Sequence, residues 1–217
     1  MARWVDLGPE LAHSPDGRGY LIAKGCTVND GTWCGFMTGD SAYLARTRLA
    51  LGELAGNLSA LNDADSWEFF AGQGQPYAPE LAGARPLFEW EHTVGGMTLT
   101  YNAPLKKFLL LSNRPSDGVS SLDCHFDTYL LEADAVDGPF RLVSYMQSLG
   151  PQMYFQHASS AFWSADGAGG TMFSSGNWDG SCATHGSNPP GERYGLVTTQ
   201  FGLVLRGGFP DPLIKYR

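Results

Sequence analysis

Long apolar runs and basic clusters are both missing from this sequence. No apolar run approaches the ~20 residues that a helix needs to cross a bilayer, and the longest basic run is the pair Lys106-Lys107. The formal net charge is −8, so the chain lacks the positive stripe that neutralises nucleic-acid phosphates. We therefore expect no membrane span and no nucleic-acid partner.

Cysteine is scarce as well, with four residues in a chain of 217. Cys26 and Cys34 flank a glycine-rich loop and can form a disulfide in an oxidising compartment, with free thiols as the alternative. The isolated positions of Cys124 and Cys182 do not complete the spacing of a zinc site. The sequence also lacks phosphate-loop and dinucleotide-binding motifs, so we expect neither a metal nor an organic cofactor.

Charged residues make up only 17% of the chain, whereas hydrophobic residues make up 43%. A disordered chain has the opposite balance, so this composition predicts a folded domain. The 28 glycines and 13 prolines are scattered between apolar runs, where they indicate turns. Many turns, many aromatic residues and few helical patterns predict an all-β fold.

Three segments follow a common plan of four strands each, over residues 1–83, 84–150 and 151–217. Each has an entering strand, a turn, a short apolar strand, a loop, and a strand that starts near residue 41, 127 or 193. Repeated four-stranded antiparallel units are the plan of a β-propeller, and a β-sandwich is the alternative. Leu49–Leu61 has leucines at helical spacing and is expected to be a short surface helix or loop.

The sequence places the strands as follows. The first unit has strands at 4–12, 19–25, 40–47 and 65–72; the second at 96–101, 108–111, 126–133 and 140–145; the third at 152–157, 170–176, 193–199 and 202–206. The innermost strands are expected at 7–13, 97–101 and 153–157.

Short motifs in these units resemble those of the five-bladed propellers of the arabinanase, levansucrase and invertase superfamily. His13–Gly17 followed by Gly19–Ile22 is similar to a blade's first hairpin, and Thr100–Phe108 resembles the Tyr-Asn-x-x-Leu hairpin of these proteins. Glu132–Ala133 with Asp137–Phe140 resembles their Glu-Ala…Gly-Pro-Trp link, with Phe140 in place of Trp. The resemblance implies a β-propeller fragment of about three four-stranded antiparallel blades.

The resemblance also implies that these are the last three blades of five. Met1 would then start a truncated chain without the secretory signal that an extracellular relative carries. Three blades leave two edges unpaired, so we expect self-association of the isolated chain.

Enzymes of this family use carboxylates around the central axis, where paired carboxyl groups with separated pKa values cleave glycosidic bonds. The inward strands carry Asp6, Glu10 and His13 in the first unit. In the second unit, Glu91 alternates with the neighbouring Trp90 and is the candidate proton donor, although a solvated strand end also explains it.

Four further residues are the candidate substrate-binding residues of an axial site. They are His13, Tyr101, Tyr154 and His157. Imidazole groups donate and accept hydrogen bonds, and tyrosine rings add apolar faces, which together suit the mixed surface of a sugar. Packed core residues and turn residues are the alternative explanation.

These observations give two hypotheses for the function. The first is a glycoside hydrolase-like propeller that acts on or binds an oligo- or polysaccharide outside the cell. The second is a non-catalytic propeller fragment that binds carbohydrate or protein. The resemblance itself argues against the catalytic hypothesis. The family's catalytic base belongs to the first blade, which a chain of the last three blades would lack.

Overall fold

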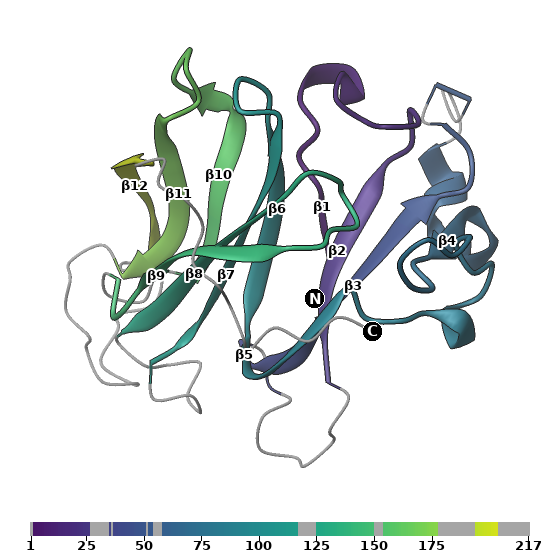
Figure 1. Cartoon of the computed structure of the whole chain (residues 1–217), viewed down its shortest axis with the longest axis horizontal. Coiled ribbons are helices and arrows are strands. Elements are labelled where there is room, and N and C mark those ends of the chain that lie inside the picture. Colours follow the sequence, from purple (N-terminus) through teal and green to yellow (C-terminus); the bar gives the residue numbers. More distant parts are fainter. Residues whose placement is uncertain are drawn as a thin grey trace.

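The computed structural model describes residues 2–26, 35, 37–50, 52–53, 58–116, 125–149, 154–177 and 194–203. These residues form three antiparallel sheets. The longest helical segment among them is the 3₁₀ helix η2 (Leu58–Asn62), which has five residues. The expected all-β class with three antiparallel sheets is confirmed, and the sheets lie side by side (Figure 1).

The first sheet has the strand order β1-β2-β3-β4, with a further strand, β5, on β3. Their bounds are β1 (Ala2–Trp4), β2 (Tyr20–Gly25), β3 (Gly39–Thr47), β4 (Trp67–Phe69) and β5 (Phe88–Val94). β4 pairs with positions 45–47 of β3, and β5 pairs with positions 39–42. The short β4 leaves main-chain groups of the longer β3 unpaired, and β5 satisfies them. Residues 88–94 therefore belong to the first sheet, although they fall in the range expected for the second unit.

The second sheet is a four-stranded meander between the other two sheets (Figure 1). It contains β6 (Gly96–Asn102), β7 (Lys107–Pro115), β8 (Phe126–Ala133) and β9 (Arg141–Met146). Leu110 and Leu131 belong to a core shared with the first sheet, whereas Leu109 and Leu130 belong to a core shared with the third. Because both faces are buried, its central strands are apolar at successive positions instead of alternating.

The third sheet contains three strands in the described ranges. They are β10 (Tyr154–Trp163), β11 (Gly169–Asn177) and β12 (Tyr194–Gly202). β10 is longer than the strand expected at 152–157. The fourth strand expected at 202–206 begins inside β12, and its residues 204–206 lie outside the described residues.

The first sheet joins the second through the segment that follows β1. Asp6 forms a parallel bridge with Thr100 of β6, and β6 also packs against β10. The expected inner strand at 7–13 is not a strand, because it contains the 3₁₀ helix η1 (Pro9–Leu11), and the pairing segment ends at Asp6. Gly8, at φ 81°, turns the chain out of this pairing in a conformation that favours glycine.

The remaining helical turns lie in the long connection between β3 and β5. They are η3 (Ala64–Ser66) and η4 (Leu81–Gly83). The helix or loop expected at 49–61 ends in η2, and residues 51 and 54–57 within it lie outside the described residues.

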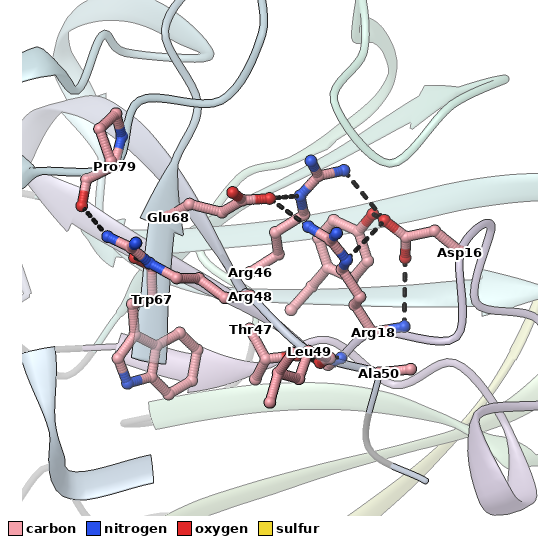
Figure 2. A network of polar contacts seen from close by, with 12 residues as sticks. Asp16, Arg18, Arg46, Thr47, Arg48, Leu49, Ala50, Trp67, Glu68 and Pro79 are labelled. Carbon is pink, nitrogen blue, oxygen red and sulfur yellow. Dashed lines mark hydrogen bonds and ion pairs between the residues drawn. The ribbon is translucent and has the colours of Figure 1, made fainter. Parts of the chain in front are cut away.

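An ion-pair network covers the outer part of the first sheet (Figure 2). Arg46 of β3 donates to Glu68 of β4 at 2.6 Å and to Asp16 at 2.9 Å, and Arg18 pairs with Glu68 as well. The hydroxyl of Tyr20 donates to Asp16 at 3.0 Å. Burial, with the nearby Asp16 carboxylate, raises the pKa of Tyr20 to about 12. The tyrosine therefore stays a hydrogen-bond donor at neutral pH.

Candidate functional site

Asp6 lies where the segment after β1 meets the other two sheets. Val5 and Leu7 on either side of it are buried in the core, so strand alternation turns the Asp6 side chain the other way. Its main-chain N–H donates to Leu99 at 2.9 Å, and its carbonyl accepts from Tyr101 at 2.8 Å. The position of the carboxylate is therefore fixed by the main chain of β6.

The third sheet supplies most of the partners of this carboxylate. Ser160 donates to Asp6 through its main-chain N–H at 2.8 Å and through its hydroxyl at 2.6 Å. The Ser159 hydroxyl donates at 3.2 Å, and His157 Nε2 lies 3.5 Å from Asp6 Oδ2. A register irregularity within β10 accompanies this arrangement, and it turns two successive serines toward the same group.

The segment that carries Asp6 supplies one more partner, because the N–H of Gly8 donates to Oδ1 at 3.1 Å. Burial by itself raises the pKa of Asp6, but hydrogen bonds from His157, Ser160 and Gly8 outweigh that effect. The net result is a pKa well below the usual range of an aspartate. Asp6 is thus a permanent negative charge at neutral pH and a poor proton donor.

Two aromatic rings lie near the segment that carries Asp6, and the Tyr101 ring packs against the core that contains Val5 and Leu7. His13 and Tyr101 have ring centroids 4.9 Å apart with an interplanar angle of 37°, and both side chains are half-buried. The His13 ring packs over Gly8, where a Cβ would come within 2.9 Å of His13 Cδ2. Glycine at this position is therefore required both by its backbone angle and by the ring above it.

We call this region the junction cluster, because residues of the β1–β2 connection, of β6 and of β10 come together there. It consists of two neighbouring groups: Asp6 with His157, Ser159 and Ser160, and the ring pair of His13 and Tyr101. The His157 side chain is 32% exposed and the Asp6 side chain is 18% exposed, so a ligand can reach the cluster from solvent. One fixed carboxylate, two imidazoles, hydroxyls and an aromatic face suit a ligand that is rich in hydroxyl groups.

Of the residues selected from the sequence, His157 lies 3.5 Å from Asp6, and His13 and Tyr101 pack against each other. Tyr154 begins β10, but its side chain lies outside the described residues. Asp6 was one of several acidic candidates on the inward strands. Ser159 and Ser160 carried no signal in the sequence, because serine pairs are common and their role depends on the irregularity in β10.

Glu91 lies elsewhere in the molecule. It is exposed on β5, next to the buried Trp90, which packs against Tyr129 with ring centroids 4.9 Å apart. β5 pairs with β3, whereas the cluster lies on β6, β10 and the segment after β1. A proton donor in an axial site should be shielded from solvent, whereas the Glu91 side chain is exposed.

Within the described ranges, no group of three or more His, Cys, Asp or Glu side chains is arranged to hold a metal ion. Cys26 is disulfide-bonded, and Cys34, its expected partner, lies outside the described residues.

No family model matches the sequence, and no curated protein matches it. In the part of the chain that the structure describes, no helix is both long enough and apolar enough to cross a membrane.

Proposed function

We propose that this chain is part of a carbohydrate-active β-propeller and that its junction cluster binds a glycosidic ligand, an oligo- or polysaccharide. The three successive antiparallel sheets would be three blades, and β6 and β10 would line the axis. The arrangement fits that plan because the segments that enter the three sheets meet at Asp6.

The observation that carries the proposal is the junction cluster itself. Its carboxylate stays ionised, and its rings and hydroxyl groups come from three segments that are far apart in the sequence. A sugar presents apolar C–H faces to aromatic rings and hydroxyl groups to acceptors and donors. His13, Tyr101 and His157 would contact the ligand, and Asp6 would hold His157 in place.

Binding is better supported than hydrolysis. Glycoside hydrolysis requires two carboxyl groups on either side of the scissile bond, one of which keeps its proton near neutral pH. The contacts of the cluster include one carboxylate, Asp6, whose oxygens already accept hydrogen bonds from Ser159, Ser160 and Gly8. We therefore favour a carbohydrate-binding role, with hydrolysis through Glu91 as the alternative.

An extracellular location is part of the same proposal. The disulfide at Cys26 supports it, because disulfides persist in oxidising compartments and are rare in the cytosol.

Affinity electrophoresis through gels that contain single soluble polysaccharides tests the binding role. We expect at least one polysaccharide to retard the wild-type protein, and His13→Ala and His157→Ala to run without retardation. Glu91→Gln is the matched control, because Glu91 is exposed on another strand, and it should be retarded like the wild type. Equal retardation of the histidine variants and the wild type would contradict a site at the junction cluster.

A further inference from the structure

The first sheet carries a hollow that shares no residue with the junction cluster. It lies between β3, the loop after β4 and the start of β5, and it encloses about 670 Å³. That volume lies within the range of ~300–1,000 Å³ that is typical of small-molecule sites. The polar side chains that line it are those of Tyr43, Gln73, Gln75, Arg85 and Glu89.

The walls of this hollow are fixed by main-chain hydrogen bonds. Phe69 and Ala78 bond to each other in both directions, at 2.8 and 2.7 Å, and the N–H of Arg85 donates to Phe70 at 2.8 Å. These bonds hold the segments before and after the loop against each other. A ligand would therefore meet a preformed surface and would not have to order the chain.

The tip of the loop is anchored to the connection between β8 and β9. The side-chain amide of Gln73 donates to the carbonyl of Asp137 at 2.6 Å. Gly72, at φ 121°, lets the chain turn just before this anchor.

The lining chemistry is neutral overall and rich in groups that both donate and accept. The positive charge of Arg85 offsets the negative charge of Glu89, so the hollow attracts neither anions nor cations as a class. The amide of Gln75 and the phenol of Tyr43 both donate and accept hydrogen bonds, as a sugar hydroxyl does. Arg85 donates to the carbonyl of Ala84 at 3.4 Å, which occupies one of its five N–H donors.

A smaller hollow, of about 290 Å³, lies on the second sheet and is lined by charged residues. There Lys107 pairs with Asp134, and Arg141 pairs with Glu132. Its polar lining therefore consists of surface ion pairs, which distinguishes it from the hollow on the first sheet.

We propose that the hollow on the first sheet binds one neutral sugar unit through Tyr43, Gln75 and Arg85. The ligand class is the same as in the proposed function, but the residues are separate, so either site can bind without the other. Two sites on one chain would let it hold a polysaccharide at two points and gain avidity.

Saturation-transfer NMR with single sugars tests the inference. The probes are D-glucose, D-galactose, D-mannose and L-arabinose, with inorganic phosphate as the anionic probe. Arg85→Ala and Gln75→Ala alter exposed side chains, so both variants should fold, which circular dichroism checks. Lys107→Ala, in the smaller hollow, is the matched control, and His157→Ala removes the junction cluster.

We expect at least one sugar to give a signal that falls about fivefold or more in Arg85→Ala and Gln75→Ala. That signal should persist in Lys107→Ala and His157→Ala. A sugar signal lost only in His157→Ala would support the proposed function and overturn this inference. Binding of phosphate in preference to every sugar, or no sugar signal that depends on Arg85, would overturn it as well.

Discussion

The turns at Ser14–Gly17 and Ser164–Gly167 have nearly the same sequence and the same internal hydrogen bonds, but different surroundings. In each, the serine hydroxyl donates to the aspartate two residues later, whose carboxylate also accepts from a main-chain N–H. Both glycines are left-handed, at φ 72° and 71°. Local sequence thus determines the shape of the turn, and the neighbouring sheets determine what the turn contributes.

The turn at Ser14–Gly17 belongs to an ion-pair network, whereas its copy packs into the second sheet. Asp16 accepts from Arg46 (Figure 2) and also from Tyr20. Asp166 accepts from Ser164 and Ala168 beside it in the chain. Gly167 is buried, and its carbonyl accepts from the fully buried Asn102 at 2.9 Å. The first turn is therefore held through its aspartate, and the second through its glycine.

Matched glycine substitutions should show the largest difference between the turns. A Cβ at Gly167 would lie 2.5 Å from Asn102 Oδ1, whereas a Cβ at Gly17 would make an ordinary contact at 3.6 Å. Left-handed strain of ~1–2 kcal/mol applies to both. Gly167→Ala should also disturb the buried bond of Asn102, for a total of about 2–4 kcal/mol. Urea unfolding of both variants measures the difference. Equal destabilisation would contradict the claim that only the second turn is held through its glycine.

Substitution of the two turn aspartates should destabilise the protein in the reverse order, more at Asp16 than at Asp166. Asp16→Asn weakens the contacts with Arg18 and Arg46 and should lower the free energy of unfolding by about 1 kcal/mol. Asp166→Asn should change it little, because that carboxylate is exposed and bonds only within its own turn in the described structure. Thermal melts at low and high salt check this, since salt should reduce the effect of Asp16→Asn. A larger effect at Asp166 would be inconsistent with the account.

Asp6 extends the comparison to an aspartate that is held by β6, β10 and its own segment. Its pKa is lowered in the folded protein, so its contribution to stability is complete above the unfolded value of about 4. That contribution is lost as the pH falls through the lower, folded value. Asp6→Asn should therefore melt well below the wild type at neutral pH, and the gap should close at acidic pH. A gap that does not change between pH 7 and pH 2 would contradict this assignment.

The smallest effect is expected at Glu91. Glu91→Gln changes an exposed side chain on β5, so both the melting temperature and saccharide binding should match the wild type. Assays with chromogenic glycosides test whether Glu91 is needed for hydrolysis. Hydrolysis by the wild type that disappears in Glu91→Gln would restore the catalytic role that the exposure of this residue argues against.

Much of the fold could be predicted because its pairings are local. The strand expected at 126–133 is β8 with the same bounds, and the strands on either side of it follow from apolar runs and turn residues. The pairing of β5 with β3 could not be predicted, because β4 and a long connection lie between these strands. The pattern of residues 88–94 predicts a strand, but it does not indicate with which sheet that strand pairs.

The candidate site was only partly predictable for a related reason. His13, Tyr101 and His157 could be selected because they lie on or next to the segments that enter each sheet, and their role in binding stays a prediction. The roles of Ser159 and Ser160 depend on a register irregularity in β10, which could not be predicted from the sequence. Glu91 was selected because it alternates with Trp90, but alternation identifies only a face of the strand and not its neighbours.

Histidine side-chain NMR during titration with a saccharide that retards the wild type tests the central claim most directly. The chain has five histidines, which can be assigned by single substitutions. The account predicts that the imidazole resonances of His13 and His157 move together as the saccharide is added, while that of His92 on β5 stays in place. Saturable binding that leaves both the His13 and His157 resonances unmoved would contradict a carbohydrate site at the junction cluster.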